Sequence, residues 1–216
     1  MKERCPPSEP LILLIRIEAE HGREENRPMD DIIAAIRRRL ETKITDLGQP
    51  WRPGLIPSEP PDFASDERRL GFALPPLMKQ IYKEIRNGGF GPGYGLIGVS
   101  NGVPDYDGRI VPANYELFRG SSTDEPDWNW PERLLPVCDW GCAIRSCVDC
   151  ADPNFRMRIF DPNVHDGDDW ADSFFEESPS FETWITAWAS GVDLWNAMYG
   201  AEGHVARILS ARRAMR

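Results

Sequence analysis

Four cysteines lie close together in the second half of the chain, and their type and spacing suggest metal or redox chemistry. Cys138, Cys142, Cys147 and Cys150 fall within thirteen residues. Zinc sites favour Cys-x-x-Cys turns, and only Cys147 and Cys150 have that spacing. Residues 142–150 alternate between apolar and polar, which predicts a strand with Cys142 and Cys150 on one face and Cys147 on the other. Such thiolates would not converge on one ion, so we expect reduced core cysteines and no metal; zinc and redox roles are the less favoured alternatives.

No other group of residues predicts a catalytic centre or a cofactor site. The histidines, His21, His165 and His204, stand in unrelated segments without metal-ligand spacing. The glycine-rich segment 90–95 follows a predicted helix and precedes a predicted strand, whereas a phosphate loop needs the opposite order. We expect a non-enzymatic protein without catalytic residues; an enzyme that uses the carboxylates of residues 161–172 is a minor alternative.

Negative charge is concentrated in one part of the chain. The formal net charge is −10, and residues 105–182 hold 18 acidic and 6 basic side chains. Nucleic acid is therefore a poor partner, since phosphate binding needs clustered Lys and Arg. The acidic segments are either a solvated surface that aids solubility or a surface complementary to a basic protein, whose encounter they would accelerate.

Tryptophans accumulate in the same half of the chain. Trp184 and Trp188 are one helical turn apart and are expected in the core. Trp128 and Trp130 alternate with polar residues in a loop, and core packing and exposure as binding anchors are equally favoured for them. The candidate partner-binding residues are Asp124, Glu125, Asp127, Trp128, Trp130, Asp161, Asp166, Asp168, Asp169, Trp170 and Asp172.

Hydrophobic periodicity and turn residues predict the elements that position these side chains. We expect an amphipathic helix at 29–47, a proline-rich extended connector at 48–66, a helix that begins at Leu74-Pro75-Pro76 and ends at Asn87-Gly88-Gly89, and a short strand at 96–99. Three antiparallel strands follow, then a helix that begins at the N-cap Ser180 and stops at Gly191, and a helical tail. The predicted ranges of the three strands and of the tail are 133–140, 142–150, 156–160 and 194–216.

This order of elements predicts an α+β fold, with one antiparallel sheet flanked by helices. We divide the chain into an N-terminal extension at 1–27, a single domain at 28–191 and a C-terminal helical extension at 192–216. The longest apolar run, 11–15, is far too short to span a bilayer. Without a signal-peptide pattern at the N-terminus, a cytoplasmic protein is expected.

Several of these segments together resemble the SUKH superfamily, the Smi/Knr-like proteins named after yeast cell-wall-synthesis regulators. The resemblance covers residues 28–191 and departs from the family pattern at Arg145, where an aromatic or aliphatic residue is frequent. Its motifs are Leu70-Gly71, Leu74-Pro75, Asn87-Gly88-Gly89, Tyr94-Gly95-Leu96-Ile97-Gly98-Val99, Cys138-Asp139-Trp140-Gly141-Cys142, Ser146-Cys147-Val148-Asp149 and Ser180-Phe181-Glu182-Thr183-Trp184 with Gly191.

The resemblance implies an α+β fold and, in bacteria, a frequent role as an immunity protein. Such a protein binds a secreted polymorphic toxin, often a nuclease, and protects the cell that produces it. The expected partner is a basic cognate toxin, held stoichiometrically through the acidic surface. The alternative is a regulatory or scaffolding module that binds an endogenous cytosolic protein.

Overall fold

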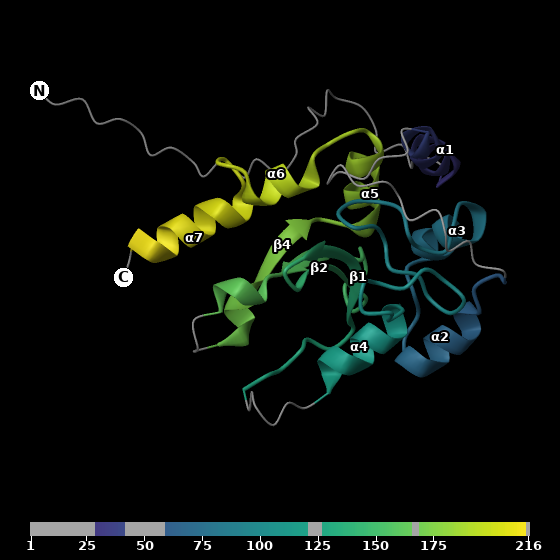
Figure 1. Cartoon of the computed structure of the whole chain (residues 1–216), viewed down its shortest axis with the longest axis horizontal. Coiled ribbons are helices and arrows are strands. Elements are labelled where there is room, and N and C mark those ends of the chain that lie inside the picture. The colour runs from purple at the N-terminus through teal and green to yellow at the C-terminus, as the bar shows by residue number, and fades with distance from the viewer. Residues whose placement is uncertain (1–28, 42–58, 121–126, 166–168, 215–216) are drawn as a thin grey trace, which may run out of the picture.

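A four-stranded antiparallel sheet forms the centre of the computed structural model (Figure 1). The model describes residues 29–41, 59–120, 127–165 and 169–214. The strands are β1 (Leu134–Gly141), β2 (Ile144–Asp149), β3 (Met157–Phe160) and β4 (Phe174–Ser178), and their order in the sheet is their order in the chain. The predicted α+β fold with an antiparallel sheet is confirmed.

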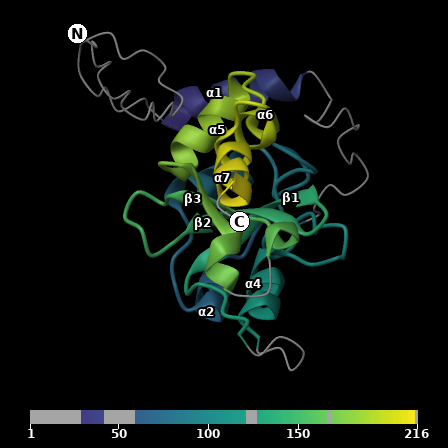
Figure 2. The same ribbon diagram turned by 90° about the vertical axis from the view of Figure 1, so that its left-hand side faces the viewer.

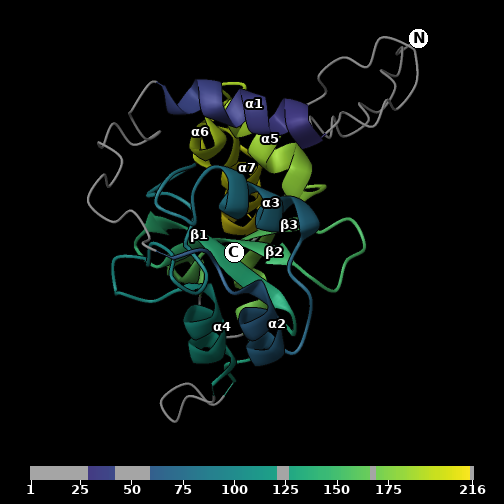
Figure 3. The ribbon, with the colours of Figure 1, turned by 90° about the vertical axis from the view of Figure 1, so that its right-hand side faces the viewer.

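Helices cover both faces of this sheet (Figures 1, 2 and 3). α4 packs against β1 on one face, with α2 beside it. α5, α6 and α7 lie on the other face, and α1 packs against α5. The helices are α1 (Met29–Leu40), α2 (Phe63–Leu70), α3 (Pro76–Glu84), α4 (Val111–Arg119), α5 (Phe181–Ala189), α6 (Leu194–Tyr199) and α7 (His204–Ala214), with two 3₁₀ turns, η1 (Pro162–Val164) and η2 (Trp170–Ser173). None of the helices in the described ranges has the length and apolar character needed to cross a membrane.

The strand register assigns side chains to the two faces of the sheet. Ser146, Ile159 and Phe175 are cross-strand neighbours on the face toward α5 and α7. Phe160 and Phe174 are neighbours on the face toward α4. Because both faces are covered, consecutive phenylalanines of β4 are both buried, so this strand lacks the apolar and polar alternation that predicts a half-exposed strand. For this reason β4 was not predicted from the sequence.

The three predicted strands are confirmed with shifted ends. Cys142 lies outside β2, in the turn after β1, where Cys142 and Ala143 both adopt the left-handed conformation with φ of 49° and 62°. The prediction of one strand from Cys142 to Cys150 is therefore wrong at its start. The predicted strand at 96–99 contributes only an isolated bridge between Leu96 and Cys138.

Two short helices, α2 and α4, were not predicted from the sequence. α2 begins within the segment expected to be extended, because Asp62 follows the last proline and its carboxylate accepts a hydrogen bond from the Ser65 amide at 3.0 Å. α4 begins at Val111 with a proline in its first turn, where a missing amide hydrogen carries no cost. For α1, residues 42–47 of the predicted helix lie outside the described residues.

The C-terminal tail is two helices rather than one. Gly200 and Gly203 separate α6 from α7, and a Cβ added at Gly203 would lie 2.4 Å from the Met198 carbonyl oxygen. Leu194, Met198 and Val205 are buried in the core cluster that the sheet and the other helices form. Both helices of the tail are therefore packed against the domain.

We expect that replacing Ser180 with alanine lowers the free energy of unfolding by about 1 kcal/mol. As predicted, Ser180 is the N-cap of α5, and its hydroxyl accepts a hydrogen bond from the Thr183 amide at 3.0 Å. Urea denaturation measures the loss. Ser190→Ala, at the exposed opposite end of the same helix, is the control and should change stability by less than about 0.5 kcal/mol. Equal losses in the two variants would contradict the capping role.

Candidate protein-binding surface

Two acidic segments that are distant in sequence meet through their tryptophans. Trp128 lies in the loop between α4 and β1, and Trp170 lies in η2, between β3 and β4. Their rings contact edge to face with centroids 4.9 Å apart. This contact brings together the two segments that carry Asp127 and Asp169, which the sequence alone only places in the same half of the chain.

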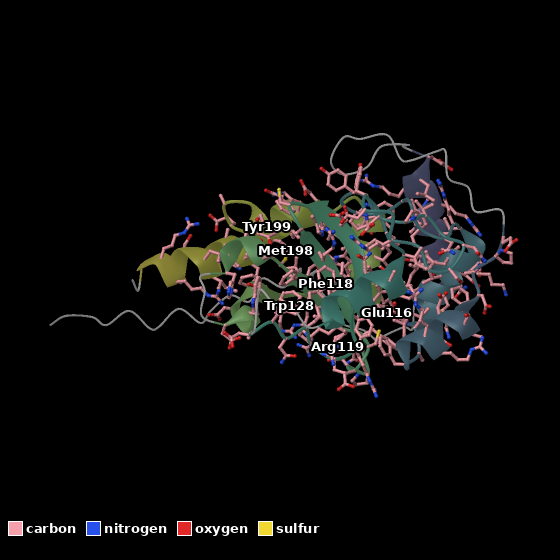
Figure 4. All side chains as sticks on the ribbon, turned by 60° about the horizontal axis from the view of Figure 1, so that its bottom comes forward. Glu116, Phe118, Arg119, Trp128, Met198 and Tyr199 are labelled. Carbon is pink, nitrogen blue, oxygen red and sulfur yellow. The ribbon has the colours of Figure 1, made fainter. Side chains whose placement is uncertain are left out.

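Trp128 is held in place and half-buried. Its indole Nε1 donates a hydrogen bond to the Phe118 carbonyl oxygen at 2.7 Å. Figure 4 shows Trp128 next to Phe118, the residue at the end of α4, and their ring centroids are 6.1 Å apart. A ring fixed in this way loses little conformational entropy when a partner covers its remaining surface.

A histidine extends the aromatic surface on the other side of Trp170. The rings of His165 and Trp170 stack with centroids 3.8 Å apart and planes 6° apart. His165 follows η1 and both side chains are half-buried. The aromatic surface therefore runs from Trp128 through Trp170 to His165.

Three exposed carboxylates lie within two residues of Trp128 or Trp170 in the chain. Asp127, Asp169 and Asp172 are all exposed. The Asp169 carboxylate caps η2 by accepting a hydrogen bond from the Ala171 amide at 2.8 Å, and Asp172 forms an ion pair with Arg212 of α7 at 3.0 Å. We call this surface the acidic-aromatic face; its residues are Asp127, Trp128, His165, Asp169, Trp170 and Asp172.

Two candidate residues do not reach this face. Trp130 is 1% exposed, and Asp161 is 3% exposed. Asp161 caps η1 and accepts hydrogen bonds from the Asn163 amide at 2.9 Å and the Tyr199 hydroxyl at 3.0 Å. Trp130 fills the core against α4. Their assignment to an exposed binding surface is wrong, while Asp124, Glu125, Asp166 and Asp168 lie outside the described residues.

Comparison with known proteins identifies the domain. The model of the SMI1/KNR4 family (SUKH-1) matches residues 60–187. The chain belongs to this family. The match covers more than half of the chain, from just before α2 to within α5, and confirms the SUKH resemblance. No curated protein and no solved structure gives a significant match.

In this SUKH-1 domain the Asn-Gly-Gly motif connects the loop at residues 98–100 to the end of α3. The Asn87 side chain accepts a hydrogen bond from the Val99 amide at 2.9 Å and donates one to the Ser100 carbonyl oxygen at 2.8 Å. Gly88 has φ of +83°, and a Cβ there would lie 2.5 Å from the Gly98 nitrogen. These residues position the loop rather than a ligand.

The departure from the family pattern at Arg145 has a structural partner. Arg145 forms a buried ion pair with Asp139, its cross-strand neighbour. Asp139 also accepts a hydrogen bond from the Gly141 amide at 2.7 Å. Burial raises the pKa of the Asp139 carboxyl, and the Arg145 charge offsets part of this rise. The buried charge of Arg145 in β2 is thus balanced by Asp139 within the SUKH-1 domain. This ion pair was not predicted from the sequence.

A second buried carboxylate connects the sheet to α5. Glu177 of β4 accepts hydrogen bonds from Trp184 Nε1 at 2.8 Å and from Ser146 Oγ at 2.9 Å. Ser146 in turn accepts a hydrogen bond from Trp140 Nε1 at 2.7 Å. Burial raises the pKa of Glu177 to about 7, and the hydrogen bonds from Trp184 and Ser146 oppose this effect. Because both donors are core side chains, we infer that Glu177 stabilises the fold and does not contact a partner.

The cysteines of the SUKH-1 domain differ in exposure. Cys138 and Cys147 are buried as predicted, Cys150 is half-buried, and Cys142 is exposed in its turn. The expectation that all four pack in the core is therefore wrong for Cys142. Burial raises the pKa of Cys147 and raises that of Cys150 to about 12, so both thiols are protonated and unreactive at neutral pH. Over the described ranges, no three His, Cys, Asp or Glu side chains are grouped as metal ligands.

Proposed function

We propose that this SUKH-1 protein is a cytoplasmic immunity protein that neutralises a basic toxin by stoichiometric binding through its acidic-aromatic face. The observation that carries the proposal is the contact between Trp128 and Trp170, which joins two acidic segments into one surface. Family membership supports a protein-binding role. Inhibition would be masking of the toxin without turnover, so the proposal assigns no catalytic residue and no cofactor.

The chemistry of the face matches a basic protein. Exposed carboxylates accelerate encounter with a positively charged partner and disfavour nucleic acid. Trp128 and Trp170 supply half-buried aromatic area next to exposed carboxylates in sequence, and tryptophan is enriched among residues that dominate binding energy. Asp169 is held in place by its cap to Ala171, so the charges are positioned before binding.

We expect that the double substitution Asp127→Asn and Asp169→Asn slows association with the toxin by about five- to tenfold and makes binding less sensitive to salt. Asparagine retains the cap of η2, since it is as good a capping residue as aspartate. The partner is first captured on the tagged chain from its native cells at low and moderate salt. Stopped-flow mixing of the two purified proteins then measures the rate.

The control is Glu59→Gln with Glu202→Gln, which removes the same charge from exposed positions outside the face. This pair is expected to change the association rate by less than about twofold. Equal slowing by both double variants would contradict the assignment of the face. Capture of an endogenous cytosolic complex in place of a toxin would instead support the regulatory scaffold.

A further inference from the structure

The last helix places an arginine on the edge of the acidic-aromatic face. Arg212 of α7 donates hydrogen bonds from Nη1 to the Asp172 carbonyl oxygen at 2.9 Å and from Nη2 to the Asp172 carboxylate at 3.0 Å. Its guanidinium carbon lies 5.3 Å from the ring centroid of Phe175. In Figure 1, α7 follows α6 and runs away from α5 toward the C-terminal end of the chain.

These three contacts define a site for a guanidinium rather than for any cation. Two acceptors on Asp172 are matched by two nitrogens of one planar fork, which lysine does not have. A guanidinium over the Phe175 ring adds a cation–π attraction. Phe175 itself is buried and fixed in β4, so the floor of the site is rigid.

The arginine in this site is accessible to competition. The Arg212 side chain is 32% exposed and that of Asp172 is 58% exposed, and exposed pairs of this kind are weak. Arg212 stands near the end of α7, and its neighbour Arg213 is exposed. Asp172 follows Trp170 by two residues in the same turn, η2, so the site is connected in sequence to the acidic-aromatic face.

We propose that Asp172 and Phe175 form a guanidinium site in which Arg212 holds the place of an arginine from the basic partner. The partner's arginine displaces Arg212, donates hydrogen bonds to the same two oxygens of Asp172 and covers the same ring. The inference rests on the proposed function, because it names the side chain by which the partner docks. α7 thereby weakens binding of cations that cannot replace all three contacts.

The test measures binding of a fluorescent deca-arginine peptide to the 216-residue chain by anisotropy at low salt. Arg212→Ala is expected to bind the peptide about three- to tenfold more tightly than Arg213→Ala, because only the first vacates the site. Both variants remove one positive charge from α7, so the general electrostatic effect cancels. Adding Asp172→Asn to Arg212→Ala should abolish the difference, and the gain should be smaller with deca-lysine.

Equal affinities of Arg212→Ala and Arg213→Ala would overturn the site, as would an equal gain with deca-lysine. Hydrogen exchange of the Leu209 amide, which lies inside α7, checks that the helix remains folded. Arg212→Lys, which keeps the net charge, should tighten deca-arginine binding by about twofold. Failure of the proposed function would leave the peptide result intact, because that result needs no toxin. Failure of the site alone would leave the effect of Asp127→Asn and Asp169→Asn on toxin association intact.

Discussion

Replacing Trp130 with alanine is expected to lower the free energy of unfolding by about 3 to 5 kcal/mol. The ring stacks on Phe118 with centroids 4.4 Å apart and meets Phe160 edge to face at 5.1 Å. Its Nε1 donates a hydrogen bond to the Leu134 carbonyl oxygen at 2.7 Å. Alanine leaves a cavity between α4 and the sheet, and it leaves a buried carbonyl oxygen without this donor, which adds to the loss.

Trp128 is the matched control for Trp130. The two residues are two positions apart and their rings are 5.9 Å apart, yet Trp128 is half-buried where Trp130 is buried. Urea denaturation should give Trp128→Ala roughly half the loss of Trp130→Ala or less, whereas toxin binding should be weakened by Trp128→Ala. Equal losses of stability would show that both rings are core residues and would remove Trp128 from the acidic-aromatic face.

The second large effect is a loss of stability as pH rises. Folded Glu177 keeps its proton up to a pKa of about 7, whereas the unfolded chain releases it near the ordinary value of 4.5. Between these values unfolding releases a proton, so raising the pH favours the unfolded state. The contribution of Glu177 is full below pH 4.5 and declines by about 3 kcal/mol on reaching pH 7.

Glu177→Gln removes this dependence, since the amide is neutral at every pH and its oxygen still accepts from Trp184 and Ser146. We expect the variant to be more stable than the wild type at pH 8 and to lack about 3 kcal/mol of the decline between pH 4.5 and 7. Glu176→Gln is the control, because its exposed carboxylate pairs with Arg156. Urea denaturation at a series of pH values measures the free energy of unfolding of each protein. If this free energy depends on pH in the same way for Glu177→Gln and for the wild type, Glu177 is not the group responsible.

The elements predicted correctly are those in which local pattern and tertiary packing agree. β1 to β3 are bounded by the turn residues of Trp140-Gly141 and Asp152-Pro153-Asn154, and Ser180 caps α5 as its sequence indicates. β4 and α2 were not predicted from the sequence. β4 has two consecutive phenylalanines, each buried on a different face of the sheet, and so lacks alternation of apolar and polar residues. α2 begins directly after a proline-rich segment, which predicted an extended connector although Asp62 is a good N-cap.

The candidate surface was predicted in composition but not in detail. Trp128 and Trp130 are two positions apart and share the neighbour Asn129. Both rings contact Phe118 and Phe160, and Trp130, the buried one, also contacts Phe174. Asp161 lies in an acidic run, yet its side chain is buried and accepts a hydrogen bond from the Tyr199 hydroxyl of α6. Contacts between distant segments decided both cases, and no local pattern encodes them.

The strand order also determines when each part of the chain can fold. Every strand of the sheet pairs with its neighbour in sequence, so the sheet forms through short loop closures as the chain is synthesised. α1, by contrast, buries Ile32, Ile33 and Ile36 against a core that includes α5, about 150 residues later. On the ribosome, α1 can therefore contact α3 early but meets α5 only after most of the chain has emerged. The first helix of the described residues is thus among the last of them to dock fully.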